Sequence, residues 1–242
     1  MHFGSSPLFY PRLFRYNVNM SVITMQEITC PCGEVFEVEI YQSVSVRSNP
    51  ELKELILAGE FNLVQCPNPQ CKKVIFAEKF LLYHDVDQEL LAFVYPREME
   101  NKLSEIQDSV SQQYKSLREE LVGEDRLQYQ PFLLFGLDRL CDLIHLEEER
   151  ADEAAIVSAL CETLSLPYKT LKNDYARRKN LPAIAPLGLE MQSENLLRQR
   201  VLEGLEIILE TNDHLVCYKI FLTQVQSDPN WTLDPAEFVE PS

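Results

Sequence analysis

The amino-acid sequence predicts an α+β protein in which a β-rich module comes first and a mostly α-helical region follows. Three observations lead to this prediction. Apolar and acidic residues alternate over residues 36–40, two close pairs of cysteines lie between residues 30 and 71, and apolar residues recur at helical steps after residue 97. We therefore expect a flexible N-terminal extension over residues 1–25, the β module over residues 26–96, the helical region over residues 97–226 and an extended tail over residues 227–242.

Composition excludes several classes of protein. The chain has 242 residues and a formal net charge of −16. Its apolar runs are far shorter than the roughly 18–20 residues that span a bilayer, so we expect no membrane protein. Direct binding to DNA or RNA is not expected either, because the phosphate backbone attracts clustered Lys and Arg, whereas residues 26–95 carry a net charge of −6.

Strand signals follow one another along the β module. A short strand is expected over Gln26–Thr29, and the alternation of Phe36, Val38 and Ile40 with glutamates predicts a second strand with one wet face. Three further segments rich in Val, Ile, Phe and Tyr are strand candidates: Phe61–Gln65, Lys72–Phe80 and Glu89–Tyr95. Because residues 85–88 have the composition of a turn, residues 79–95 are expected to form a hairpin.

One short helix is predicted between the second and third strands. Asn49 can cap its start, Pro50 suits its first position, and Gly59 suits the left-handed residue that ends a helix. Its buried face would be made by three apolar residues: Leu52, Leu55 and Ile56.

The two cysteine pairs lie at turns of the β module. Cys30-Pro31-Cys32-Gly33 follows the first strand, and Cys66 and Cys71 enclose a proline-containing turn between two later strands. Zinc prefers four tetrahedral ligands, and two tight turns that each project two thiolates can supply them. Proline stiffens such a turn, and glycine tolerates the positive φ that points backbone N–H groups at sulfur. We therefore predict one structural zinc ion held by Cys30, Cys32, Cys66 and Cys71, as in a zinc ribbon.

Other interpretations of these cysteines stay open. One residue separates the first two and four residues separate the second two, whereas ribbon ligands are usually two to four residues apart. Cys30 and Cys32 could instead form a redox dithiol, or all four thiols could stay without a ligand. An odd number of cysteines without a secretory signal favours a reducing compartment, so we expect a cytoplasmic protein. Cys141, Cys161 and Cys217 lie among apolar residues and are expected in the core.

A wider set of residues resembles one known family. It comprises Cys30-Pro31, Cys32-Gly33, Pro50-Glu51-Leu52-Lys53, Gly59, Cys66-Pro67, Cys71 and Leu82-Tyr83-His84-Asp85, followed by residues 131–137 and Leu140. With these residues, the segment 26–150 resembles the CpXC family, a zinc-ribbon-like group named for its paired CPxC motifs. The resemblance implies that the four paired cysteines are the metal ligands and that a helical part follows the β module. It implies no particular activity.

The first helix of the helical region carries an apolar stripe at near-heptad spacing, and Gly123 would end it. The stripe consists of Met99, Leu103, Ile106, Val110, Leu117 and Leu121. Its length suffices either for a short coiled coil between two chains or for packing within one chain. A homodimer through residues 99–121 and intramolecular packing are therefore both open.

Further helices are expected in the remainder of the chain. They cover Pro131–Arg150, Ala154–Leu166, Tyr168–Lys179 and Glu194–Thr211, with a linker over Pro182–Leu187. The short apolar run Leu215–Val225 suits a helix or a strand equally well.

The sequence contains no catalytic constellation and no glycine-rich phosphate loop, so we expect a protein that is not an enzyme. The leading hypothesis is a binding or scaffold protein, in which zinc closes a small β domain and the acidic helical region contacts a protein partner. The alternatives are a zinc-ribbon regulator of transcription or of nucleic-acid-associated machinery, and a thiol redox protein that uses Cys30 and Cys32.

Overall fold

The computed structural model describes residues 18–121, 127–188 and 196–239. The chain divides into two compact units, Met1–Cys141 and Asp142–Ser242. Residues 1–17, which form most of the expected N-terminal extension, and Gly123, the expected helix end, lie outside the described residues. A strand begins at Val22, so the last four residues of the expected extension belong to the β structure.

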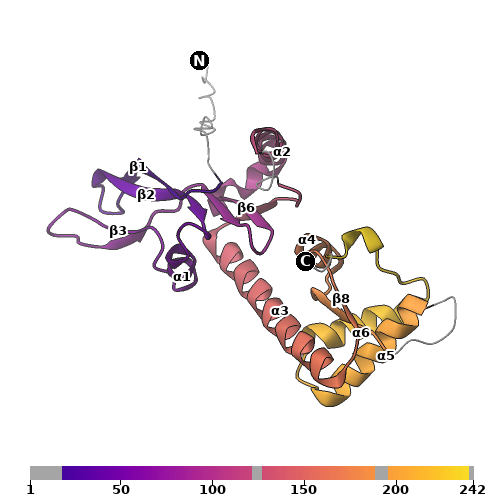
Figure 1. Ribbon diagram of the computed structural model, residues 1–242. Coiled ribbons are helices and arrows are strands. Elements are labelled where there is room, and N and C mark those ends of the chain that lie inside the picture. Colours follow the sequence, from indigo (N-terminus) through magenta and orange to yellow (C-terminus); the bar gives the residue numbers. More distant parts are fainter. Residues whose placement is uncertain (1–17, 122–126, 189–195, 240–242) are drawn as a thin grey trace. The chain divides into compact units, whose positions relative to one another are not determined.

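A mixed five-stranded sheet organises the first unit (Figure 1). It contains β1 (Val22–Thr29), β2 (Val35–Ser45), β5 (Leu81–Asp85), β6 (Leu90–Tyr95) and β7 (Phe132–Phe135), in the order β1-β2-β5-β6-β7. β1 and β2 pair antiparallel, as do β5 and β6, whereas β2–β5 and β6–β7 are parallel. The predicted alternation on β2 is confirmed, because Phe36 and Val38 are half-buried and Ile40 is buried, while the glutamates between them are exposed.

The predicted hairpin over residues 79–95 is also confirmed, as β5 and β6. In the turn between them, the Asp85 Oδ1 atom accepts the backbone N–H of Gln88 at 3.2 Å. Every residue of these two strands is buried. The hairpin is therefore the centre of the sheet.

A second, two-stranded ribbon consists of β3 (Leu63–Gln65) and β4 (Val74–Phe76), which are shorter than the predicted strands. It packs on the β1–β2 ribbon through a small apolar cluster of Ile28, Ile40, Val64 and Ala77. The two cysteine pairs lie in the loops of these two ribbons.

The predicted short helix is α1 (Glu51–Leu57), and Gly59 follows it with a φ of +70°, as predicted. Two details differ from the prediction. The Asn49 side chain donates to the Glu51 carboxylate at 2.8 Å instead of capping the helix, and Leu55 is exposed because the buried face is narrow and uses Leu52 and Ile56 alone.

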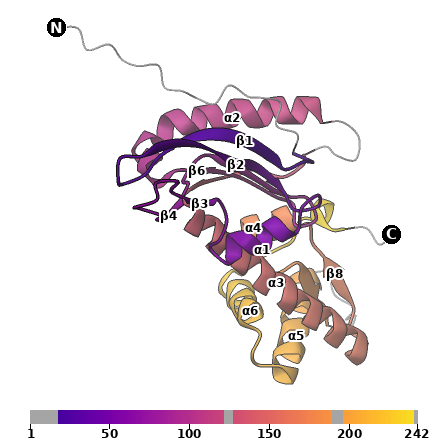
Figure 2. The same ribbon diagram turned by 90° about the vertical axis from the view of Figure 1, so that its left-hand side faces the viewer.

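The predicted apolar stripe lies on a short 3₁₀ helix, η1 (Arg97–Lys102), and on α2 (Leu103–Glu120). Figure 2 shows α2 along one face of the sheet and α1 on the other. Ile106, Val110 and Leu117 are buried in one cluster with Leu82 and Phe93 of the sheet. The stripe therefore packs on the sheet of its own chain, which is the second of the two arrangements that the sequence left open. It also makes α2 part of the first unit, so the predicted division at residue 96 does not coincide with the boundary between the units.

One strand of the first unit was not predicted. Phe132–Phe135, expected at the start of a helix, forms β7 and pairs in parallel with residues 92–95 of β6. Gly136, with a φ of +93°, separates it from the following helix. An apolar run of this length, between a proline and a glycine, is too short for periodicity to distinguish strand from helix.

The expected helices over residues 131–150 and 154–166 are one continuous helix, α3 (Leu137–Leu164). No glycine or proline occurs between its ends, so nothing in the backbone chemistry interrupts it. It ends where Ser165 takes a φ of +55° and Pro167 follows.

The second unit continues with β8 (Tyr168–Thr170), α4 (Asn173–Lys179), β9 (Ile184–Pro186), α5 (Leu196–Thr211) and α6 (Val216–Ser227). The predicted helix over 168–179 is thus helical only in its second half, and the predicted linker over 182–187 contains a buried strand that pairs with β8. Strands of three residues carry no usable alternation. The ambiguous run 215–225 is helical.

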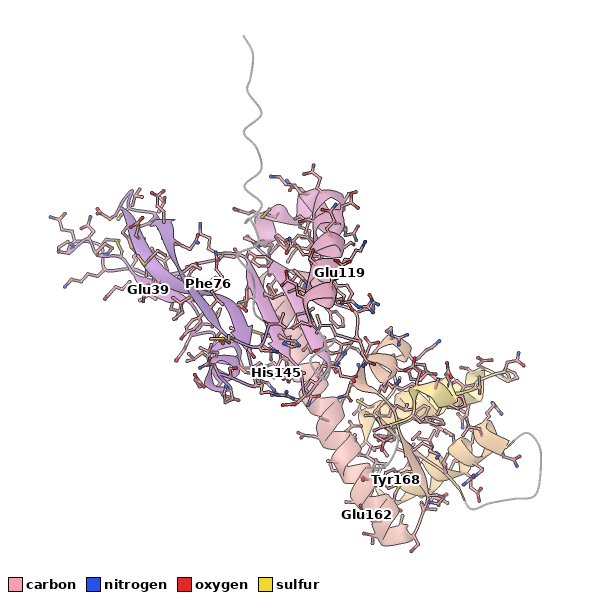
Figure 3. The ribbon with its side chains drawn as sticks, turned by 45° about the horizontal axis from the view of Figure 1, so that its top comes forward. Glu39, Phe76, Glu119, His145, Glu162 and Tyr168 are labelled. Carbon is pink, nitrogen blue, oxygen red and sulfur yellow. The ribbon has the colours of Figure 1, made fainter. Side chains whose placement is uncertain are left out.

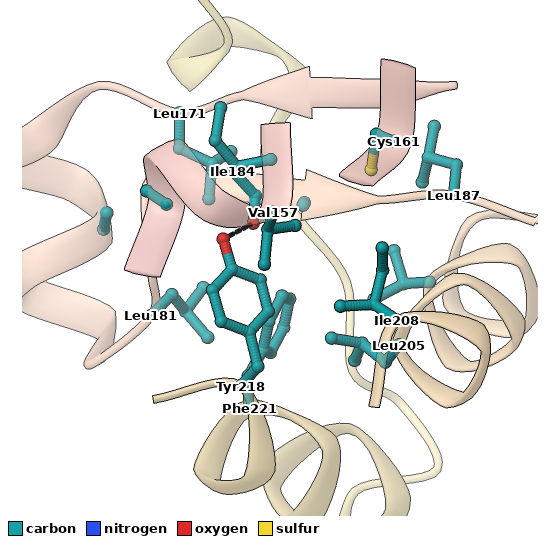
Figure 4. Packing of buried hydrophobic residues seen from close by; sticks show 14 of the residues in the cluster. Val157, Cys161, Leu171, Leu181, Ile184, Leu187, Leu205, Ile208, Tyr218 and Phe221 are labelled. Atoms are coloured by element: carbon teal, nitrogen blue, oxygen red, sulfur yellow. Dashed lines mark hydrogen bonds between the residues drawn. The ribbon is translucent and has the colours of Figure 1, made fainter. Parts of the chain in front are cut away.

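The core of the second unit gathers side chains from all these elements (Figure 4). Tyr218 is fully buried in it, and its hydroxyl donates to the backbone C=O of Ile184 at 3.0 Å. Residues 228–239 contribute to this core through Trp231, Leu233 and Phe238. Leu233 is buried, the Trp231 ring lies 5.6 Å from that of Phe221, and residues 235–237 form a 3₁₀ turn.

In the described ranges, no helix has both the length and the apolar composition needed to cross a membrane.

Candidate metal centre

The first cysteine pair lies in the loop between β1 and β2. The backbone N–H of Gly33 donates to the C=O of Cys30, and the N–H of Cys30 donates to the C=O of Glu34, both at 2.8 Å. Gly33 has a φ of +93°, a conformation that favours glycine. The loop therefore closes tightly, and the positive φ predicted for Gly33 is confirmed.

The second pair lies in the loop between β3 and β4. The N–H of Cys66 donates to the C=O of Lys73 at 2.8 Å, and the N–H groups of Cys71 and Lys72 donate to the C=O of Asn68 at 3.0 and 3.1 Å. Lys72 has a φ of +50° and stands directly after Cys71, as Gly33 stands directly after Cys32. Sequence reasoning missed this role of Lys72. The only signal for a positive φ at Lys72 was its position directly after the second cysteine of the pair, because the residue is not a glycine.

The two loops bring all four predicted ligands together. Their Sγ atoms lie within 4.8 Å of one another. The Sγ atoms of Cys30 and Cys71 are 3.7 Å apart, and those of Cys32 and Cys66 are 3.8 Å apart. Four sulfurs at about 2.3 Å from a tetrahedral zinc ion are about 3.8 Å from each other. The sulfur positions therefore fit a zinc ion, despite the single residue between Cys30 and Cys32.

The four thiols differ in burial. Cys30 and Cys66 are each 2% exposed, Cys71 is intermediate and Cys32 is exposed. One buried thiol comes from each ribbon, next to the apolar cluster that joins the ribbons. A metal ion here would link the two ribbons at the end of a small core.

The pKa values of the thiols also differ. Burial raises the pKa of Cys66 to about 12. The pKa of Cys32 is lowered, chiefly by a backbone hydrogen bond from Glu34. A backbone hydrogen bond from Cys32 lowers the pKa of Cys30, but burial and neighbouring thiols outweigh it and the net shift is upward. The buried thiols are therefore protonated at neutral pH without a metal, and a cation that binds here displaces their protons.

The other cysteines lie outside this group. Cys161 is buried in the core of the second unit, and burial raises its pKa to about 11. Cys217 is half-buried, and the Cys141 thiol donates to the C=O of Ile56 at 3.3 Å. Cys161 is thus a core residue as predicted, whereas Cys141 and Cys217 are only partly buried. In the part of the chain that the structure describes, the four paired cysteines form the one group suited to a metal ion.

Comparison with known proteins finds a match to the segment that contains these four cysteines. A family model described as CpXC protein matches residues 28–158, which is more than half of the chain and includes all four paired cysteines. The resemblance expected from the sequence is thereby confirmed. Searches of curated proteins and of solved structures each found no match to the chain.

Proposed function

The chain belongs to the CpXC family, and from this premise we propose that it is a non-enzymatic binding or scaffold protein whose β module is held together by one structural zinc ion. The observation that carries the proposal is the approach of four Sγ atoms from two separate ribbons at the distances of a tetrahedral site. Bound zinc would supply a cross-link between the ribbons and charge compensation for the thiolates.

The donor set favours a structural over a catalytic metal. Catalytic zinc sites keep one coordination position open for water or substrate, whereas four thiolates fill a tetrahedral shell. The Sγ atoms also approach one another between the ribbons, Cys30 with Cys71 and Cys32 with Cys66, so the geometry favours ligation by all four thiols over a redox dithiol of Cys30 and Cys32. Thiolate sets of this kind select zinc or iron over harder cations.

The proposed partner is another protein. Acidic residues are exposed along α2, including Glu119 and Glu120, and the net charge of the chain disfavours direct contact with nucleic acid. A reducing compartment such as the cytoplasm would keep the thiols available for the metal.

Metal analysis of protein purified under reducing conditions tests the proposal. We expect one zinc ion per chain, four sulfur ligands by X-ray absorption, and a large loss of zinc in Cys30→Ser and Cys66→Ser. Cys141→Ser is the matched control, because this thiol lies outside the group of four and should leave the zinc content unchanged. Protein without zinc or iron, whose four paired thiols all react freely with a thiol reagent, would contradict the proposal.

A further inference from the structure

The free edge of the five-stranded sheet is a surface that the metal centre does not use. In the described residues β1 pairs only with β2 and forms one end of the strand order. Edge strands present unpaired backbone N–H and C=O groups, to which another extended segment can bind. Of the two edges of this sheet, the one at β1 is the longer, at 8 residues against the 4 of β7.

The register identifies which backbone groups are available. The N–H of Cys30 donates to Glu34, so this position is a hydrogen-bonded pair, and such pairs alternate with non-hydrogen-bonded ones along an antiparallel ladder. The pairing is regular from Thr24 to Thr29. Met25, Glu27 and Thr29 therefore occupy the non-hydrogen-bonded positions, and their N–H and C=O groups point away from β2, towards the free edge.

The side chains at this edge are apolar and acidic. Ile23 and Met25 are 48% and 54% exposed, and Glu27, Glu37 and Glu39 are exposed beside them. Figure 3 labels Glu39 on the β1–β2 ribbon. In the described parts of the chain, none of the three carboxylates forms an ion pair.

Two of these carboxylates repel each other. Glu27 lies directly opposite Glu37 in the antiparallel register, and like charges at such positions destabilise a strand pair. A cation placed next to Glu27 would relieve that repulsion. The arrangement is therefore complementary to a partner with positive charge.

We infer that β1 binds an extended, Lys- or Arg-bearing segment of another protein by strand addition. The partner backbone would bond to Met25, Glu27 and Thr29. Its cationic side chains would lie on the exposed face next to Glu27, and their alkyl stems would cover Ile23 and Met25, which lie on the same face. Adjacent strands are about 4.8 Å apart, so the long side chains of Lys and Arg also reach towards Glu37 on β2. The inference rests on the proposed binding role and names the chemistry of its partner.

A second copy of this chain is a poorer occupant of the edge. Pairing β1 with the β1 of another copy would bring two sets of unpaired glutamates together, and the resulting repulsion opposes association. The acidic edge thus selects against self-pairing and for a basic partner.

A direct test uses the full-length, metal-loaded protein and a fluorescent Lys-Val alternating heptapeptide with blocked ends. We expect binding that weakens with salt. We expect a loss of about fivefold in affinity for the double variant Glu27→Gln, Glu37→Gln, because two exposed ion pairs are removed. The matched control is Glu60→Gln, an exposed glutamate of the same unit, which should bind the peptide like the wild type.

Three further measurements distinguish strand addition from simple charge attraction. Met25→Pro removes one outward N–H without removing a β1–β2 hydrogen bond, and should abolish most of the binding. Amide exchange of Met25, Glu27 and Thr29 should slow when the peptide binds, whereas Gln26 and Ile28 should not change. A Lys-Val peptide N-methylated at alternate residues should not bind.

Equal binding of a Glu-Val peptide, binding that survives N-methylation, or absence of binding at millimolar peptide would each overturn the inference. Metal content is measured on the same samples. Zinc-loaded protein without peptide binding would refute the edge site alone, whereas zinc-free protein that still binds the peptide would refute the zinc proposal alone.

Discussion

Gly33 and Lys72 occupy equivalent places in the two cysteine loops, each directly after the second cysteine of a pair and each with a positive φ. Glycine adopts this conformation freely, whereas a residue with a Cβ atom is strained there by about 1–2 kcal/mol. The second loop therefore has a strained residue where the first has none. This difference allows opposite predictions for two single substitutions.

Lys72→Gly should stabilise the first unit by about 0.5–1 kcal/mol, because glycine relieves the left-handed strain but adds freedom to the unfolded chain. Gly33→Ala should destabilise it by about 1–2 kcal/mol. A Cβ atom at Gly33 would meet nothing within 4 Å, so this loss is purely conformational. Urea unfolding of the zinc-loaded variants measures both effects. A Lys72→Gly variant less stable than the wild type would show that the Lys72 side chain has another role.

Asp85 makes stability depend on pH. Burial raises the pKa of its carboxyl group above the ordinary value of 3.8. A carboxyl whose folded pKa is raised stabilises the fold only at low pH, and this contribution is lost as the pH rises through the folded pKa. At pH 7 the ionised, buried side chain therefore lowers the stability of the fold.

Asp85→Asn should therefore raise the melting temperature at pH 7, because the amide oxygen can still accept the Gln88 N–H without a buried charge. The gain should shrink as the pH falls towards 3.8. Thermal melts across this range compare it with Asp87→Asn, which removes an exposed carboxylate paired with Arg47 and should give no such gain. A gain in melting temperature that does not depend on pH would contradict the conclusion that the buried charge of Asp85 destabilises the fold.

At the scale of elements, the apolar stripe of α2 packs against the sheet. Ile106 is 1% exposed and lies in the cluster with the sheet, whereas Leu103, on the same helix, is 43% exposed. Ile106→Asp would place a charge in the core and should destabilise the first unit by about 3 kcal/mol or more, while Leu103→Asp should change little. Urea unfolding followed by circular dichroism measures the difference. Conversion of a wild-type dimer into a stable, folded monomer by Ile106→Asp would instead favour the coiled-coil alternative.

The elements also show which parts of the fold can be predicted from the sequence and which cannot. The strands up to Tyr95 were predictable because alternation on Phe36–Ile40, the turn at Asp85 and the proline and glycine around α1 are local signals. β7, β8 and β9 were missed because each has three or four residues and is defined by its partner strand, which the local sequence does not contain. The four cysteines were identified because turns concentrate ligands, but only the fold shows that sulfurs of different ribbons approach to 3.7 and 3.8 Å.

At the scale of the whole molecule, the described residues form a separate core in each of two units, and the group of four cysteines lies in the first. Structural zinc contributes on the order of 10 kcal/mol in metal-dependent peptides, which is comparable to the whole stability of a domain. Chelation should therefore loosen the two ribbons around Ile28, Ile40 and Val64. The core of Val201, Leu205 and Tyr218 in the second unit has no link to the metal and should stay folded.

Hydrogen exchange with mass spectrometry, with and without chelator, measures this difference. Exchange should accelerate over residues 22–40 and 62–77 and remain slow in α5 and α6. β5 and β6 should exchange more slowly than the two ribbons after chelation, because they are also held by α2, through Phe93 and Ile106. Fast exchange throughout both units after chelation would show that they unfold as one.

The parallel pairing of β6 with β7 has a consequence for synthesis of the protein. The two strands are about 40 residues apart in sequence, and contacts between distant residues form slowly because a long loop must close first. At roughly 5–20 residues per second, a ribosome needs about 2–8 s to proceed from one strand to the other. Throughout that interval the edge of β6 that will pair with β7 has no partner strand, and such unpaired edges make a nascent chain prone to aggregation.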